Sequence, residues 1–192
     1  RYYGYTYERN AAHTRATGLD LQAHYLTRFG RAGSVTWSLM MNQQQHQIIR
    51  VNPLNVNLGS GITALFRSQI GNITTLYPRN TIRLNATWNI QRWSTTLRLS
   101  RYSATKLLSD RGAAYDETVA PAWLVDFDLT YRFPNRIKVS VGGNNVFNHR
   151  PQTLSATAQS AASLLQVNPN YSSAAIYGAE GGYYYGKVAW SW

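Results

Sequence analysis

The sequence predicts an all-β fold, in which an antiparallel, up-and-down sheet forms the wall of a transmembrane β-barrel. Three observations support this prediction. Apolar and polar residues alternate with period two over seven stretches of the chain. The connections between these stretches are alternately short and long. Polar residues occupy the middle of one face, whereas Trp and Tyr concentrate near the strand ends, as in barrels that meet lipid.

The predicted strands are about 9–13 residues long, close to the ~9–11 residues that cross a bilayer at a tilt. In 81–91, for example, Leu84 and Trp88 fall on the apolar face and Arg83 on the polar one. The seven segments are 17–29, 34–42, 81–91, 93–102, 123–133, 137–145 and 183–192, and 2–7 is a candidate for an eighth.

The connections predict that all the long loops lie at one end of the sheet. The short ones are 30–33, 91–92 and 134–136, and the long ones are 49–80, 103–121 and 148–182. The short turns pair Ile90 with Trp93 and Phe133 with Ile137, which brings apolar faces together without a slip in register. The Ala- and Ser-rich stretch 154–167 could form a short amphipathic helix, but we favour a long external loop folded over the pore mouth.

The composition excludes several classes of protein. No apolar run approaches the ~20 residues of a transmembrane helix. The absence of cysteine excludes a disulfide scaffold, a Cys-based zinc site and thiol catalysis. The net charge of +11 attracts nucleic acid, anionic lipid or an anionic ligand, and charge alone does not decide among them. The chain starts at Arg1 without a targeting segment, so we expect it to begin inside a longer product or at a processing site.

Three stretches resemble TonB-dependent outer-membrane receptors. The first is 124–133, followed after a tight turn by Gly142-Gly143-Asn144-Asn145-Val146-Phe147, which is similar to the penultimate hairpin of that family. The second is 181–192, a Gly-Gly-aromatic start with a terminal aromatic residue, and the third is the Gly-Leu-Asp-Leu strand at 18–21. The resemblance implies that 1–192 is the C-terminal portion of a receptor barrel, about 7–8 of 22 strands, without the plug domain and the upstream strands.

The resemblance also implies a function. We expect part of an outer-membrane active transporter that binds and imports a scarce nutrient with TonB-derived energy, and neither an enzyme nor a cofactor-binding protein. The arginine excess favours an anionic ligand such as a ferric siderophore. The expected partners are the remaining barrel and plug, the TonB complex through the plug, lipopolysaccharide and the barrel assembly machinery, but not nucleic acid. Two alternatives stay open: a small complete barrel with a structural or adhesion role, and a soluble basic β-protein that binds nucleic acid.

Site residues follow from the predicted faces and loops. The residues expected to line the lumen are Asp20, His24, Arg83, Arg98, Asp126, Asp128 and Arg132. The aromatic residues expected at the periplasmic interface are Phe29, Trp88, Trp93, Phe133, Trp190 and Trp192, and those nearer the extracellular one are Tyr25, Trp123 and Tyr184. The loop residues expected to touch ligand are Tyr115, Arg150, Tyr171 and Tyr177, and the expected assembly signal is Val188, Trp190 and Trp192.

Signals for other chemistry are weak. The four histidines lack metal-ligand spacing, so no metal site is expected. Asp126 and Asp128 share a face and could suggest paired-carboxylate catalysis, but ion pairing with Arg132 and other arginines is the better interpretation. The pairs Gly142-Gly143 and Gly181-Gly182 indicate close backbone approach or a bulge rather than a phosphate cradle.

Overall fold

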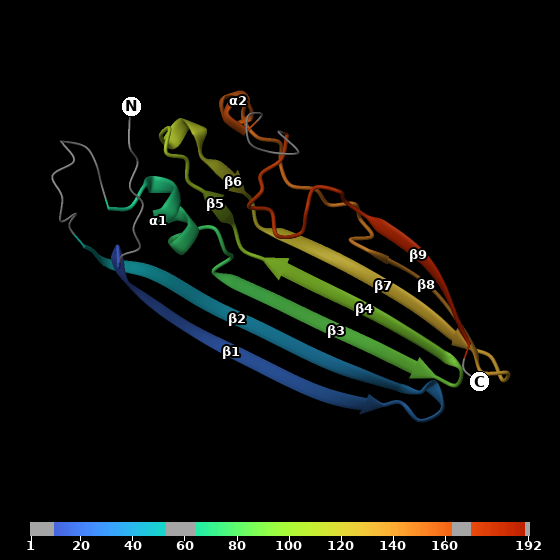
Figure 1. Cartoon of the computed structure of the whole chain (residues 1–192). Coiled ribbons are helices and arrows are strands. Elements are labelled where there is room, and N and C mark those ends of the chain that lie inside the picture. The colour runs from blue at the N-terminus through green and yellow to red at the C-terminus, as the bar shows by residue number, and fades with distance from the viewer. Residues whose placement is uncertain (1–9, 53–63, 163–169, 191–192) are drawn as a thin grey trace.

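The computed structural model describes residues 10–52, 64–162 and 170–190 and contains one seven-stranded antiparallel sheet (Figure 1). Its strands, in spatial order, are β1 (Ala12–Arg28), β2 (Ser34–Val51), β3 (Asn80–Ile90), β4 (Trp93–Tyr102), β7 (Ala122–Arg132), β8 (Ile137–Asn144) and β9 (Tyr183–Trp190). Each strand pairs with its neighbour along the chain apart from the insertion of β5 and β6, so the predicted up-and-down order is confirmed.

The long connections contain small elements of their own. They are α1 (Arg67–Thr74), the hairpin of β5 (Thr105–Leu107) and β6 (Glu117–Val119), the 3-10 turn η2 (Ala113–Tyr115) and α2 (Ala156–Ala162). All of them lie at one end of the sheet, whereas the three short turns and the end of β9 lie at the other (Figure 1). We call these the loop end and the turn end. Within the long loop that we favoured over 154–167, α2 forms the short helix that the composition had left open, and 163–167 lies outside the described residues.

The register separates apolar from polar residues in continuous rows across the sheet. One row, from β1 to β7, consists of Ala23, Leu39, Leu84, Leu99 and Val125. The adjacent row consists of His24, Ser38, Asn85, Arg98 and Asp126. Because successive residues of a strand point to opposite faces, one face of the sheet is apolar and the other polar.

The apolar face is not covered by another layer of the described chain. Leu19 and Val188 are 70% and 72% exposed. The buried apolar residues of the described chain lie instead at the loop end: Val119, Ala122, Leu154, Ala158 and Ala174. A sheet with an open apolar face needs an apolar solvent, and lipid supplies one.

The first two strands are longer than predicted. β1 begins at Ala12 rather than residue 17, and β2 continues to Val51 rather than ending at residue 42. The Gln-rich segment 43–47 has no apolar alternation, but it pairs with β1 through backbone hydrogen bonds, which do not depend on side-chain type. The candidate strand 2–7 lies outside the described residues.

The short turns have the backbone conformations that tight connections require. Gln91 and Arg136 have φ values of 51° and 63°, in the left-handed region. In the turn η1 (Gly30–Ala32), Phe29 N–H donates to Gly33 O at 2.8 Å, and the indole of Trp88 donates to Ala32 O at 2.8 Å. The predicted pairing of Ile90 with Trp93 is confirmed, as is that of Phe133 with Ile137, whose carbonyl accepts from Phe133 N–H at 2.8 Å. No helix in the described part of the chain is long and apolar enough to cross a membrane.

Candidate functional site

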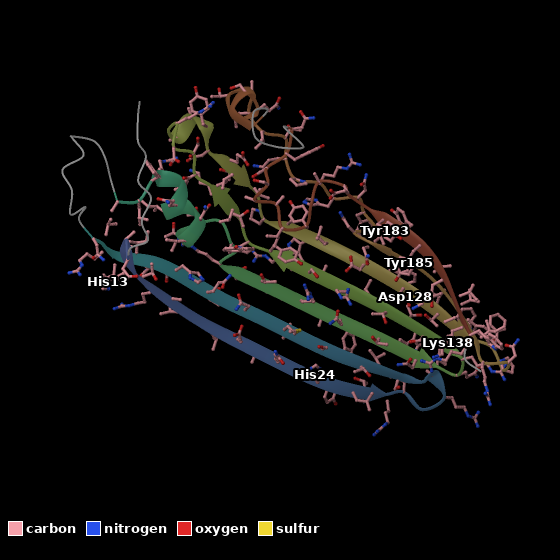
Figure 2. The ribbon with its side chains drawn as sticks, viewed as in Figure 1. His13, His24, Asp128, Lys138, Tyr183 and Tyr185 are labelled. Carbon is pink, nitrogen blue, oxygen red and sulfur yellow. The ribbon has the colours of Figure 1, made fainter. Side chains whose placement is uncertain are left out.

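The polar face of the sheet carries every residue that the sequence predicted to line a lumen. The register places the whole set on this face: Asp20, His24, Arg83, Arg98, Asp126, Asp128 and Arg132. Figure 2 shows His24 on the first strand and Asp128 far across the sheet. Whether these residues line a lumen stays a prediction.

Arg98 is the centre of a hydrogen-bonded group on this face. Its Nε donates to Asn85 Oδ1 at 2.9 Å, and its Nη1 lies 3.4 Å from Asp126 Oδ2. The other oxygen of Asp126 accepts the backbone N–H of Asn145 at 2.8 Å. Arg132, which we expected to pair with the carboxylates, instead lies opposite Lys138 beside the turn end, because it is six residues further along β7 than Asp126.

Asp128 has a separate set of partners. The hydroxyl groups of Tyr185 and Thr130 donate to it at 2.9 and 3.0 Å. Thr130 in turn lies 2.7 Å from the hydroxyl of Ser140 on β8. The two aspartates therefore belong to different hydrogen-bonded groups, which fits a polar wall better than a paired-carboxylate reaction centre.

The Gly-Gly-Asn-Asn stretch ends β8 and leads into the loop between β8 and β9. A Cβ at Gly142 would lie 2.7 Å from Tyr185 Cζ, and one at Gly143 would lie 2.7 Å from Tyr184 Cδ1. The expected close approach is therefore confirmed for this pair. Asn145, with a φ of 50°, also exchanges two hydrogen bonds with the backbone of His149, at 2.7 and 2.9 Å.

The predicted interface aromatics lie on the apolar face near strand ends. Trp93 contacts Tyr131, which contacts Phe133 at the turn end, with ring centroids 4.5 and 4.7 Å apart. Phe29, Trp88 and Trp190 are also at this end, and Trp123 and Tyr184 are near the loop end. Our placement of Tyr25 near the extracellular end is wrong: it lies opposite Trp37, three residues before β1 ends at the turn end. Trp192 lies outside the described residues, and the interface role of the set stays a prediction.

At the loop end, the long connections pack together into a layer, formed by 64–79, 103–121 and the described parts of 145–182. Both Nη atoms of Arg67 in α1 donate to the carboxylate of Asp116, and Lys106 Nζ lies 3.0 Å from the same carboxylate. The Asp116 side chain is only 3% exposed. The hydrogen bond from Arg67 holds the pKa of Asp116 well below its usual range. This ion cluster therefore ties α1 to the β5–β6 hairpin at neutral pH.

The third loop joins the same layer through buried polar contacts. Ser172 Oγ donates to Glu117 Oε2 at 2.7 Å, and Thr105 Oγ1 donates to Ala174 O at 2.9 Å. The side-chain amide of Gln152 forms two hydrogen bonds to the backbone of β6 and the residue after it. It donates to Thr118 O at 2.9 Å and accepts from Ala120 N–H at 3.0 Å.

The four predicted ligand residues all lie in this layer. Tyr115 ends η2 and is half-buried, and Tyr171 forms an isolated bridge with Thr153. Arg150 is exposed, with its Nη2 at 3.4 Å from Glu180 O. The ring of Tyr177 packs against Tyr102 and His149, with centroids at 6.4 and 5.7 Å, and burial raises its pKa. These contacts give Tyr177 a packing role, and ligand contact by any of the four stays a prediction.

A pocket of about 460 Å³ lies where the segment after α1, the β5–β6 hairpin, the middle of β2 and the loop ends of β3 and β4 meet. Its lining residues are Gln43, Thr75, Tyr77, Arg79, Asn80, Ser103, Ala104, Thr105, Lys106 and Thr118. This lining contains two cationic side chains and no carboxylate, although Lys106 also pairs with Asp116. None of the four predicted ligand residues lines it. No local sequence pattern marks this pocket, because its lining comes from four separate segments.

Metal binding has no support in the described residues, among which no group of three or more His, Asp or Glu could hold an ion.

Comparison with known families decides the assignment. Residues 2–146 match the family described as TonB dependent receptor-like, beta-barrel, which is well over half of the chain. The chain belongs to the TonB-dependent receptor family. Its sheet is therefore a segment of a receptor β-barrel in the bacterial outer membrane, and proteins of this family are transporters rather than enzymes.

Further comparisons place the receptor segment among known proteins. No curated protein matches the sequence. Among solved structures, the chain is similar to the ferric yersiniabactin uptake receptor of Yersinia pestis, with 18% identity and a TM-score of 0.49. The match covers 74% of this chain and 20% of that receptor, so the chain spans about a fifth of its length.

Proposed function

We propose that this chain is the C-terminal portion, 1–192, of an outer-membrane active transporter that imports a scarce anionic nutrient, such as a ferric siderophore. The observation that supports this proposal is a sheet that belongs to a receptor barrel family. Its polar face is rich in charged and hydrogen-bonding groups, and its long loops form a layer over one end. The sheet supplies the lumen wall, and the layer supplies the surface that meets the ligand. Energy comes from the TonB complex acting on a plug domain.

The open edges of the sheet support the need for further barrel strands. Among the described strands, β1 and β9 each pair on one side only. Unpaired backbone groups are too costly in lipid for a sheet to stay open there. The rest of the barrel, from an upstream part or a separate chain, pairs with both edges, and the plug packs against the polar face. Val188 and Trp190, which are 72% and 65% exposed, form the signal read by the assembly machinery, together with Trp192.

The cationic pocket supports an anionic ligand. Arg79 is exposed at the pocket, beside the exposed ring of Tyr77. A guanidinium binds carboxylates and phenolates through paired N–H donors, and the ring adds apolar contact. Arg79 and Tyr77 therefore join Tyr115, Arg150, Tyr171 and Tyr177 as candidate ligand contacts. Lipopolysaccharide phosphates are a second anionic partner for the exposed Arg79 and Arg150.

The test uses the full-length receptor in cells that lack other receptors for ferric siderophores. We expect uptake of ⁵⁵Fe from an anionic ferric siderophore to require TonB, while binding does not. The variant Arg79→Gln loses a charged contact of about 1.5–3 kcal/mol, so the dissociation constant rises by roughly 10- to 100-fold. The matched control is Arg111→Gln, an exposed arginine of the same layer outside the pocket.

Two results would contradict the proposal in different ways. Uptake that does not depend on TonB would refute active transport. Equal affinity of the wild type and Arg79→Gln for the anionic complex, or equal affinity of neutral and anionic complexes, would refute the role of the pocket.

A further inference from the structure

The turn end of the sheet carries cations without any acidic residue. None of the eight acidic residues of the sequence falls within 28–34, 90–95 or 130–138. Each of the three short turns contains one arginine: Arg31, Arg92 and Arg136. All three side chains are exposed, and no described ion pair includes them.

Each of these arginines is in a turn that adjoins an aromatic residue of the apolar face. Arg31 is in the turn whose Ala32 carbonyl accepts from the indole of Trp88. Arg92 precedes Trp93, which is 45% exposed. Arg136 follows Phe133 in the last turn, and Phe133 is 43% exposed. The same pair, an arginine and a lipid-facing ring, therefore recurs at every short turn.

We propose that these three turns form a binding rim for anionic phospholipid headgroups of the periplasmic leaflet, with Arg31, Arg92 and Arg136 each contacting a phosphate. Indole and phenyl rings settle at the level of the headgroups, which brings the neighbouring arginine to the phosphates. The guanidinium presents two parallel N–H donors to phosphate oxygens, and its stem lies along the apolar boundary. A uniformly cationic rim favours phospholipids with net negative charge, such as phosphatidylglycerol, over zwitterionic ones. The inference rests on the barrel orientation of the family and adds a lipid partner to the proposed transport function.

The test measures lipid selectivity of the full-length receptor in reconstituted bilayers. Electron paramagnetic resonance gives the association constant of spin-labelled phosphatidylglycerol relative to spin-labelled phosphatidylcholine. We expect the wild type to prefer phosphatidylglycerol at low salt, and the preference to weaken as salt rises. Removal of one arginine should lower the relative association constant for phosphatidylglycerol at the lipid sites beside that arginine by up to about fivefold. The variant Arg31→Gln/Arg92→Gln/Arg136→Gln should therefore lose most of the selectivity that comes from the turn end.

A matched variant separates the turn end from total charge. Arg15→Gln/Arg50→Gln/Arg111→Gln removes three exposed arginines located toward the loop end, so its net charge is the same. It should retain the selectivity that the turn-end variant loses. The variant Arg31→Lys/Arg92→Lys/Arg136→Lys should keep much of the selectivity, because it keeps the charge.

The proposal is overturned if the turn-end variant prefers phosphatidylglycerol as strongly as the wild type does. The cationic rim would then bind an acidic periplasmic protein instead of lipid. It is also overturned if the matched variant loses as much selectivity. Heat-modifiable migration of every variant shows that it is assembled. Because lipid selectivity is measured without ligand or TonB, failure here leaves the transport proposal intact, and failure of transport leaves the rim intact.

Discussion

An arginine at Leu84 and one at Ser38 should have very different effects on the stability of the barrel. Leu84 is the fifth residue of the eleven in β3 and lies between Leu39 and Leu99 in an apolar row. Ser38 lies in the adjacent polar row, between His24 and Asn85. The two positions are therefore at nearly the same depth on opposite faces of the wall.

The magnitude follows from depth and face. A lipid-facing Arg near the bilayer midplane costs about 2–4 kcal/mol, a factor of roughly 30 to 1000 in the folding equilibrium. Ser38→Arg points to the polar face and should cost less than about 1 kcal/mol. Its charge lies two strands from Arg98, roughly 10 Å away, about one Debye length at 0.1 M salt. Asn85 is a poor control, because it accepts a hydrogen bond from Arg98 and a second guanidinium there would face the first directly.

The assay is denaturant unfolding of the full-length receptor in lipid bilayers, together with the fraction of heat-modifiable protein in outer membranes. We expect Leu84→Arg to lower both strongly and Ser38→Arg to resemble the wild type. Equal losses for the two variants would mean that the faces have been assigned to the wrong solvents, and a larger loss for Ser38→Arg would mean that they are reversed.

Three further predictions concern the layer, the glycines and the topology. Asp116→Asn should release α1 from the β5–β6 hairpin, seen as faster amide exchange of both. In the wild type, the lowered pKa of Asp116 means that its carboxylate contributes its full stabilisation above about pH 3.9, the pKa of the unfolded state. This stabilisation is lost only as pH falls through the lower pKa of the folded state. Amide protection, corrected for intrinsic exchange, should therefore be equal at pH 7 and pH 5. Gly142→Ala should cost about 1–3 kcal/mol, because its Cβ would overlap both the carbonyl oxygen of Phe127 and the ring of Tyr185, each at 2.7 Å. Tyr185→Ala in the same chain should recover only the part due to the ring, and no recovery would contradict the overlap with Tyr185. A cysteine at Asn135, in a short turn, should resist an impermeant thiol reagent on whole cells while one at Ala114 reacts, and the opposite pattern would invert the topology.

The wall could be predicted from the sequence because its signal is local. A strand in which every second residue is apolar fixes which side faces lipid, and a two- or three-residue turn then fixes register with the next strand. β3, β4, β7 and β8 accordingly begin and end within one residue of the prediction. The hydrogen bonds between Arg98 and its neighbours on β3 and β7 follow from the same register, although the predicted partner of the carboxylates was Arg132.

The layer could not be predicted because its contacts join residues distant in sequence. Arg67 and Asp116 are 49 positions apart, and Glu117 and Ser172 are 55 apart. Neither pair belongs to a periodic pattern, so no local signal marks it. The extension of β2 through its Gln-rich segment was missed for a related reason: backbone pairing with β1 decides it, and polar side chains on both faces give no alternation.

The wall and the layer are therefore stabilised by different interactions and meet at Asn145. The wall depends on ladder hydrogen bonds and on lipid around its apolar face, whereas the layer depends on an ion cluster and on buried polar pairs such as Glu117 with Ser172. Asn145 bonds to both, because its backbone N–H donates to Asp126 in the wall and its side chain holds the backbone of His149 in the loop. The left-handed backbone at this residue lets one position direct its N–H to the polar face while its side chain closes the loop. An asparagine fits these demands together, since it tolerates that conformation and carries both a donor and an acceptor.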